Sequence, residues 1–218
     1  MSSKKSMLSF AQKYAKNYVY SQFGEEGILS ECERRGISIF HCVEIGGNNG
    51  HYCSNTALQI ESDVGVVTGL FVEADFGLYQ QCVSNWKHNA LVRCQCCKVD
   101  DKNINAFVND DCDLLSLDTD GWDYRIFAGL KAKPKIVIIE IDSSYPPDVY
   151  TFNSDGAGTY RNTLELGISK GYCLLCHTGN LIFIRNEYRE LFPEIEGDGL
   201  SNAELYFNRG WLKTEVAA

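Results

Sequence analysis

Acidic side chains follow each of five apolar runs in the first two thirds of this 218-residue chain. The five exits read Glu44-Ile45-Gly46-Gly47-Asn48-Asn49-Gly50, Glu73-Ala74-Asp75, Val99-Asp100, Asp118-Thr119-Asp120 and Glu140-Ile141-Asp142. Carboxylates gathered in one place need hydrogen-bond donors, cations or a metal ion to offset their repulsion. Paired acids also serve as general acids and bases and bind divalent ions. We therefore expect the chemistry of this chain at these exits.

The apolar runs have the composition of strands that are buried on both faces. They are rich in Val, Ile, Leu and Phe and show little polar alternation, which is typical of a parallel sheet between two helical layers. The predicted strands are 39–45, 66–73, 91–97, 114–118 and 135–141, and the predicted helices lie near 7–19, 54–61, 75–88, 102–109, 122–131 and 159–170. Residues 172–177 and 181–185, joined by Thr178-Gly179-Asn180, predict a closing antiparallel hairpin.

This alternation predicts an α/β protein with a Rossmann-like, mostly parallel sheet that ends in an antiparallel hairpin and has helices on both faces. We expect one domain over 1–218, with an N-terminal helical segment (1–20) and a C-terminal extension (187–218). Ligands of open α/β sheets bind outside the carboxyl ends of the strands. All five acidic exits are therefore predicted to share one edge.

The first exit is a glycine-rich turn between a strand and a helix. A dinucleotide-binding turn would read G-x-G-x-x-G, but Ile45 stands at the first glycine position, which disfavours NAD-dependent redox chemistry. Residues 44–50 instead fit acid-x-Gly-x-Asn-x-Gly. This is an S-adenosylmethionine-binding pattern in which Asn replaces the glycine that more commonly stands at the middle position. Glu44 would face the cofactor's ammonium, and Glu73 is suited to accept hydrogen bonds from both ribose hydroxyls.

Several motifs in this order resemble the FkbM-type methyltransferases. They are Tyr20-Ser21-Gln22-Phe23-Gly24-Glu25-Glu26-Gly27, residues 43–50 with Ser54-Asn55-Thr56, 114–124, 137–147, Gly171-Tyr172 and 181–185, which together cover about 18–186. The resemblance implies a class I methyltransferase sheet and methyl transfer to a hydroxyl, commonly on a sugar or glycan. The cofactor contacts expected from motif and resemblance are Gln22, Glu44, Gly46, Gly47, Asn48, Gly50, Glu73, Ala74, Asp75, Asp100 and Asp118.

The catalytic candidates are the acids at the fourth and fifth exits. Asp118, Asp120, Glu140 and Asp142 leave neighbouring strands, and such an all-oxygen set suits Mg or Mn rather than zinc. The acceptor hydroxyl needs either a general base, for which Asp120 or Glu140 is suited, or a divalent ion that lowers its pKa. His51, after the glycine loop, is a further catalytic candidate, although a hydrogen-bonded loop histidine is the commoner case.

Composition excludes several other classes. The net charge of −9 disfavours a nucleic-acid binder. The longest apolar runs are too short for a membrane span, and the N-terminus lacks the apolar core of a secretory signal, so a cytoplasmic location is expected. The ten cysteines are expected to be buried thiols rather than disulfides or zinc ligands. Monomer and homodimer both stay open.

Two alternative functions also stay open. Asp118-Thr119-Asp120 is a D-x-D pattern, which metal-dependent sugar-nucleotide glycosyltransferases use to hold a metal ion and a diphosphate, although no Arg or Lys pattern supports it. A non-catalytic carbohydrate- or partner-binding module on the same fold is the second alternative, because fold does not fix function. The acidic exits favour an enzyme.

Overall fold

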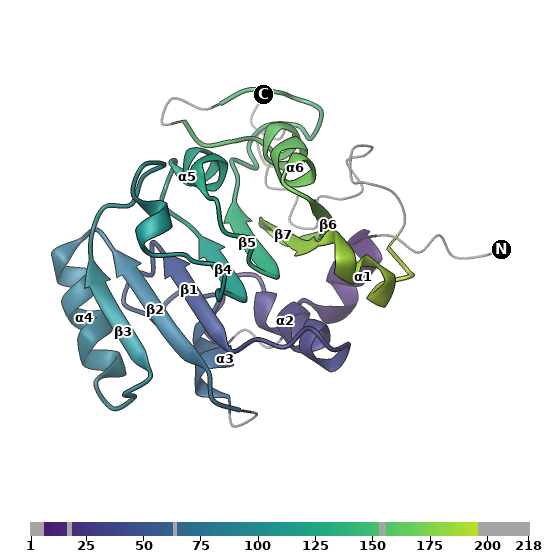
Figure 1. Cartoon of the computed structure of the whole chain (residues 1–218). Coiled ribbons are helices and arrows are strands. Elements are labelled where there is room, and N and C mark those ends of the chain that lie inside the picture. Colours follow the sequence, from purple (N-terminus) through teal and green to yellow (C-terminus); the bar gives the residue numbers. More distant parts are fainter. Residues whose placement is uncertain (1–6, 17–18, 63–64, 153–155, 196–218) are drawn as a thin grey trace, which may run out of the picture.

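A seven-stranded mixed sheet forms the centre of the molecule, as seen in a computed structural model that describes residues 7–16, 19–62, 65–152 and 156–195 (Figure 1). The strand order is β3-β2-β1-β4-β5-β7-β6. Strands β1 to β5 run parallel, while β7 pairs antiparallel with both β5 and β6. The strand bounds are β1 His41–Ile45, β2 Thr68–Glu73, β3 Val92–Cys96, β4 Leu114–Leu117, β5 Ile136–Glu140, β6 Tyr172–His177 and β7 Asn180–Arg185.

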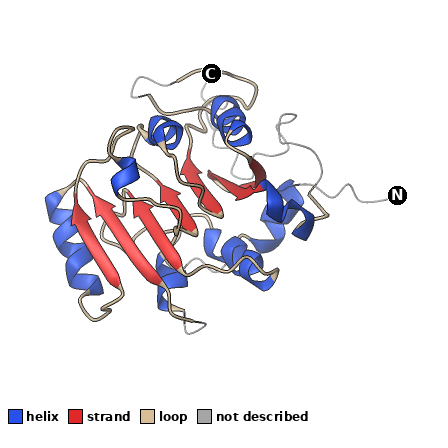
Figure 2. Cartoon of the chain, in the orientation of Figure 1, coloured by secondary structure: helices blue, strands red, loops and turns tan. Residues whose placement is uncertain are grey.

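Helices cover both faces of this sheet (Figure 2). Helices α2, α3 and α4 lie on one face, where Trp86 of α4 stacks on Phe71 of β2. Helices α5 and α6 lie on the other, where Phe127 of α5 contacts Phe183 of β7. The bounds are α1 Met7–Tyr14, α2 Glu25–Arg34, α3 Ala57–Glu61, α4 Phe76–Trp86, α5 Asp123–Gly129 and α6 Tyr160–Ser169, with short 3-10 turns η1 Ile104–Ala106 and η2 Asn186–Leu191.

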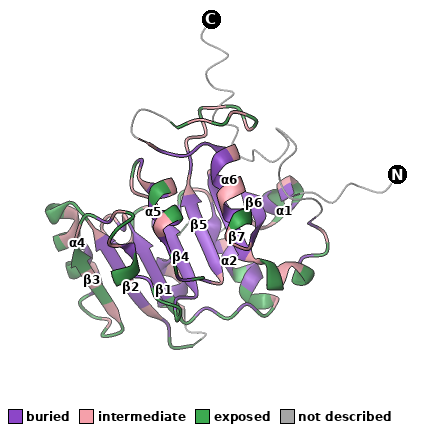
Figure 3. Cartoon of the chain, turned by 45° about the horizontal axis from the view of Figure 1, so that its top comes forward, coloured by how far each residue is buried: buried purple, intermediate pink, exposed green. Residues whose placement is uncertain are grey.

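The hydrophobic core is centred on the middle strands of the sheet, β4 and β5. Every residue of β4 and the first four residues of β5 are buried, which explains why these runs carry apolar side chains on both faces (Figure 3). The edge strand β3 and helix α4 are much more exposed. The hydrophobic stabilisation is therefore concentrated beside the fourth and fifth exits, where β4 and β5 end.

All seven predicted strands are confirmed within two residues of their expected ends. The predicted helix over 102–109 is wrong, because that segment forms only the three-residue turn η1. The Asp100 carboxylate accepts hydrogen bonds from the Lys102 and Asn103 amides, and the Asn105 side chain bonds the backbone of Gly129 and Lys131. These local side-chain bonds replace the regular ladder that a longer helix would need.

Helix α2 was not among the predicted helices. It begins with Glu25 and Glu26, a favourable pair beside the positive helix N-terminus, and buries Ile28, Leu29 and Cys32. Its packing against α1 is close: a Cβ on Gly27 would come within 2.1 Å of the Tyr14 carbonyl oxygen. The apolar spacing of α2 is helical, so the signal was present in the sequence.

The remaining expectations concern the chain ends and membranes. None of the helices that the structure describes combines the length and apolar character needed to cross a bilayer. Of the predicted C-terminal extension, residues 187–195 contain most of η2, and residues 196–218 lie outside the described part of the chain.

The buried His177, the last residue of β6, gives the fold a measurable acid sensitivity. Burial lowers its pKa to about 4, below the ordinary value of 6.5, so the folded state resists protonation. Stability should therefore fall as the pH drops below 6.5, by about 2 kcal/mol between pH 7 and pH 5 from this group. Chemical denaturation of the wild type and His177→Gln at both pH values checks this. The variant should lose less stability on acidification, whereas an exposed-site control, His88→Gln, should keep the wild-type slope. Equal slopes in all three proteins would contradict the assignment.

Candidate active site

A cavity of about 560 Å³ opens at the carboxyl edge of the sheet. It is bounded by the exits of β1, β2, β3, β4 and β5, which confirms that these exits share one edge. Of the predicted site residues, nine line it: Gln22, Gly46, Asn48, Glu73, Ala74, Asp75, Asp118, Asp120 and Glu140. Six do not: Glu44, Gly47, Gly50, His51, Asp100 and Asp142.

The glycine loop contributes Gly46 and Asn48 to the lining of the cavity. Gly46 has φ +80° and its amide bonds the Val72 carbonyl of β2. A Cβ at this position would lie 1.6 Å from the carbonyl oxygen of Asp118. Glycine is therefore required both by its backbone angle and by the close approach of β1 and β4. Asn48 also has positive φ (49°), which Asn tolerates better than most residues, and this accounts for Asn at the middle position of the motif.

Glu73, the last residue of β2, ties the glycine loop to the next exit. Its Oε2 accepts the Asn48 amide at 2.8 Å and its Oε1 accepts the Asp75 amide at 2.7 Å. Asp75 in turn caps α4 through Leu78 N. Each carboxylate oxygen of Glu73 has a second lone pair, so the group is held in place while it can still accept a ligand's hydroxyls.

Glu44 lies beneath the cavity rather than on its wall. Its two oxygens accept bonds from Ser54 Oγ (2.7 Å), Thr56 Oγ1 (2.5 Å) and the Asn55 amide (3.1 Å). Burial raises its pKa to about 7. The Ser-Asn-Thr motif thus supplies donors for a buried carboxylate. In this geometry Glu44 fixes the segment after the glycine loop, and its contact with an ammonium group stays a prediction.

The glycines at 47 and 50 make room for packing. A Cβ on Gly47 would press on Phe71, and one on Gly50 (φ +79°) would meet Trp86 and Cys82. The Trp86 indole also donates to the Gly50 carbonyl at 3.1 Å. Both glycines therefore let the loop lie against β2 and α4, outside the cavity lining.

Three predicted polar residues are engaged elsewhere. His51 stacks on Tyr20, with ring centroids 5.0 Å apart, and its Nε2 lies 3.5 Å from a Glu61 carboxylate oxygen. The Asp100 carboxylate closes the turn before η1, as described above. Asp142 accepts bonds from the Ser144 amide and hydroxyl. Strand exits were predicted correctly as a group, but the direction of each side chain depends on the turn that follows.

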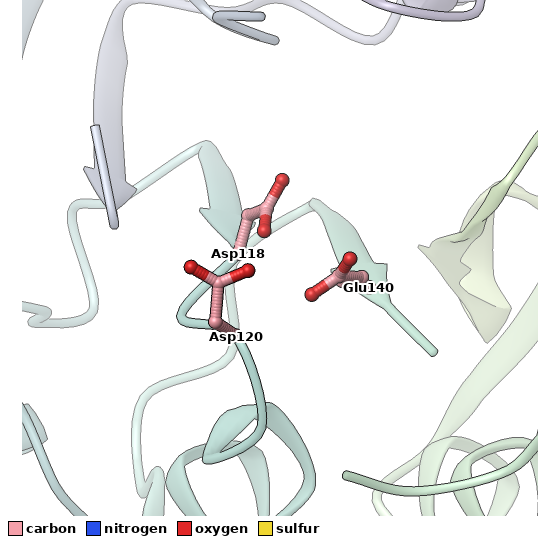
Figure 4. A group of neighbouring side chains, drawn as sticks. All are labelled: Asp118, Asp120 and Glu140. Carbon is pink, nitrogen blue, oxygen red and sulfur yellow. The ribbon is translucent and has the colours of Figure 1, made fainter. Parts of the chain in front are cut away.

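Three carboxylates converge on one side of the cavity (Figure 4). Asp118 and Asp120 follow β4, Glu140 ends β5, and one oxygen from each lies within 4.8 Å of the others. Asp120 has φ +54°, a strained backbone angle that turns its side chain toward the other two. Burial raises the pKa of both Asp118 and Glu140, and the negative charge of Asp123 raises it further.

This trio has the donor chemistry of a divalent-cation site. Its ligand atoms are all carboxylate oxygens, which suit Mg²⁺, Mn²⁺ or Ca²⁺. Within the described part of the chain, no Lys, Arg or His forms an ion pair with any of the three. A cation would therefore relieve the repulsion between Asp118 and Glu140, which contributes to the raised pKa of Glu140. Asp142, which was predicted as a fourth ligand, lies outside the converging group.

Gln22 reaches the cavity because two buried acids hold the segment that carries it. Glu26 accepts bonds from the Tyr20 and Ser21 amides and from the Ser21 hydroxyl. Glu25 accepts bonds from the Phe23 amide and from Thr178 and Asn180 in the β6–β7 turn. Glu25 and Glu26 thus have structural roles. Gln22 lies between Ser21 and Phe23, which these two acids bind, and it lines the cavity.

Several lining residues were not predicted from the sequence. Leu78 and Val99 supply apolar wall, while Tyr52 stands at the cavity with 67% of its surface exposed. Trp122 also lines it, and the cationic groups of Lys98 and Arg125 lie 5.4 and 5.2 Å from its ring centre. Val99 belongs to the third predicted exit, Val99-Asp100, although only Asp100 of that exit was predicted as a site residue. Nothing in the sequence distinguishes Tyr52 from an ordinary loop tyrosine.

Comparison with known proteins relates the fold to solved structures. No protein-family model and no curated protein matches the chain. A crystal structure of monomeric WbdD matches with a TM-score of 0.51 and 14% identity, over 74% of this chain and 40% of that one. A second WbdD crystal structure matches with a TM-score of 0.51 and 12% identity, over 82% and 47%. A Staphylococcus aureus structure described as a caffeoyl-CoA O-methyltransferase matches with a TM-score of 0.49 and 14% identity, over 82% and 92%.

These similarities concern the fold. The chain spans less than half the length of the WbdD chains that it matches. The strand order, the antiparallel β7 and the helices on both faces are those of the Rossmann-like class I methyltransferase fold, and the chain has that fold. Its cavity lies at the carboxyl edge, where open α/β sheets bind their ligands.

The close approach at Gly46 gives a direct test of the site geometry. Gly46→Ala should destabilise the fold by more than about 3 kcal/mol, because the new Cβ would overlap the Asp118 carbonyl. Gly36→Ala is the matched control: Gly36 also has positive φ, but nothing lies within 4 Å of the point that its new methyl group would occupy. That control should cost only about 1 kcal/mol, the strain of the backbone angle. Urea denaturation measures both, and equal costs would show that β1 and β4 do not meet in this way.

Proposed function

We propose that this protein is an S-adenosylmethionine-dependent O-methyltransferase that methylates a hydroxyl of a sugar or glycan. The observation that carries the proposal is the joining of two features in one cavity: Glu73 and the glycine loop on one side, and the convergent acids Asp118, Asp120 and Glu140 on the other. The class I fold and the resemblance to FkbM-type methyltransferases support the same assignment.

The cavity suits the cofactor in size and in chemistry. Its 560 Å³ falls in the usual range for small-molecule sites, about 300–1,000 Å³. Glu73 would accept bonds from the ribose hydroxyls, and Leu78 and Val99 offer apolar contact for the adenine ring. When bound, S-adenosylmethionine supplies an electrophilic methyl group. The protein's own task is then to place the acceptor oxygen in line with that methyl group and to remove its proton.

The three convergent acids are the groups suited to that proton transfer. Asp120 or Glu140 would take the hydroxyl proton as general base, and the same two residues with Asp118 would hold a divalent ion if one is bound. Such an ion would lower the pKa of the hydroxyl. Burial and the negative charge of Asp118 raise the pKa of Glu140 to about 9, so with no ion present Glu140 must first lose a proton before it can act as the base.

The walls of the cavity favour a neutral acceptor with a sugar-like face. The convergent carboxylates would repel a phosphorylated or otherwise anionic substrate. Tyr52 offers an exposed aromatic ring at the cavity, and such rings pack against the apolar face of a sugar. Trp122 is less available for this role, since Lys98 and Arg125 already lie near its ring.

Cofactor binding is tested by calorimetric titration with S-adenosylmethionine. Glu73→Ala should weaken binding by about 10-fold or more, because it removes the ribose acceptor and the tie to Asn48. The exposed acid Asp110, replaced by Asn, is the control for charge alone and should leave the affinity unchanged. Binding of a UDP-sugar in place of S-adenosylmethionine would overturn the proposal and favour the glycosyltransferase alternative.

Turnover is tested by a methyl-transfer screen over sugars and glycans, with and without EDTA. Asp120→Asn and Glu140→Gln should each lower kcat by about 100-fold or more while the affinity for S-adenosylmethionine changes little. Loss of activity in EDTA that Mg²⁺ or Mn²⁺ restores would assign the acids to a metal ion, and activity unchanged by EDTA would assign them to base catalysis. Full activity in both variants would refute the role given to these acids, and absence of any methyl transfer despite cofactor binding would favour a binding module.

A further inference from the structure

Two cysteines lie in contact behind the glycine loop. The Sγ atoms of Cys82, in α4, and Cys94, in β3, are 3.3 Å apart. All ten cysteines of the chain lie in the described ranges and are free thiols, and no other pair has its sulfur atoms in hydrogen-bond contact. A disulfide has an S–S length of about 2.05 Å, so bonding this pair needs the sulfurs to approach by little more than 1 Å.

The two thiols differ in ways that suit them to successive steps of an oxidation. Cys94 lies on the exposed edge strand and is only half-buried, whereas Cys82 is 1% exposed. A hydrogen bond between the two thiols lowers the pKa of Cys94 and raises that of Cys82. The thiolate is the reactive form of cysteine, so Cys94 is the accessible nucleophile and Cys82 lies where it can resolve the product.

We propose that Cys82 and Cys94 form an oxidation site, at which a peroxide converts the thiol pair into a disulfide between α4 and β3. The Cys94 sulfur attacks one peroxide oxygen, the O–O bond breaks, and Cys94 becomes a sulfenic acid as one water leaves. The Cys82 sulfur then attacks the Cys94 sulfur, the S–O bond breaks, and the second water leaves with the Cys82 proton. Two thiols and one hydrogen peroxide thus give one disulfide and two waters.

The position of the pair connects this site with the cavity. The Cys82 sulfur lies 2.8 Å from the point where a Cβ on Gly50 would stand, so it packs directly against the glycine loop. The neighbouring thiols make other contacts: Cys96, the last residue of β3, contacts the Ala74 carbonyl, and Cys97, just after the strand, contacts the Lys98 carbonyl. These two cysteines provide matched controls, because their sulfur atoms do not contact Cys82.

The test is a thiol count and a disulfide map of the full-length protein. Reduced protein is treated with a small excess of hydrogen peroxide, the free thiols are titrated after denaturation, and the unreduced protein is digested with chymotrypsin. Cleavage after Tyr79 and Trp86 releases 80–86, which contains Cys82 alone. We expect the count to fall from ten to eight and peptide 80–86 to be linked to Cys94, as assigned by tandem mass spectrometry, with dithiothreitol restoring ten.

The variants separate this pair from nonspecific oxidation. Cys94→Ser should keep all nine of its thiols under the same treatment, whereas Cys96→Ser should fall from nine to seven. A count that stays at ten in the wild type would overturn the proposal. So would a link from 80–86 to Cys96 or Cys97, or oxidation of Cys94 to a sulfinic acid without any link to Cys82.

Discussion

Buried carboxylates that are satisfied by neutral donors fix the loops at the carboxyl edge of this sheet. Glu25, Glu26, Glu44 and Asp123 are each at most 2% exposed, and each accepts bonds from backbone amides together with side-chain hydroxyl or amide groups. An unsatisfied buried charge would cost several kcal/mol, so each acid strongly specifies the conformation of the segment that satisfies it. The acids that line the cavity depend on this framework, because the segments that the buried carboxylates hold either carry the cavity-lining acids or pack beside them.

The acidity of the chain therefore has two separate uses. One set of carboxylates holds the loops, a second set, Asp118, Asp120 and Glu140, faces the cavity, and Glu73 and Asp75 do both. A stretch of sequence does not reveal which set a residue joins. Asp118 and Asp123 are five residues apart, yet the first lines the cavity while the second accepts bonds from Thr119 and Gly121 in the turn between them.

The sheet was predictable because its signal is local and strong. Residues such as 136–139 are apolar on both faces, a pattern typical of a covered central strand. The absence of the predicted helix after β3 could not be foreseen in the same way. There the side chains of Asp100 and Asn105 bond backbone groups, and helix propensity does not account for such bonds. Propensity is a weak guide where polar side chains compete for the backbone.

The sequence predicted the region of the candidate site, but it was a poorer guide to the contacts of individual residues. Gly46 was found through a motif whose spacing reflects a close backbone approach, and Glu73 through its place at the end of the next strand. Glu44 belongs to the same motif but serves Ser54 and Thr56, ten and twelve residues further along. The direction of a side chain at a strand exit depends on the following turn, and Tyr52 was missed because nothing in the sequence distinguishes it from an ordinary loop tyrosine.

The bond between Glu25 and Thr178 joins residues 153 positions apart, and it bears on the order in which the molecule is made. The ribosome delivers the leading segment first, but the partner of its buried acid emerges only after six strands of the sheet. The wall that carries Gln22 can therefore be fixed only after residue 180 has been synthesised. Contacts of such long range slow folding, because the chain must close a large loop before it gains their stabilisation. A nascent chain that stops before the hairpin would hold most of the sheet and still lack a finished cavity.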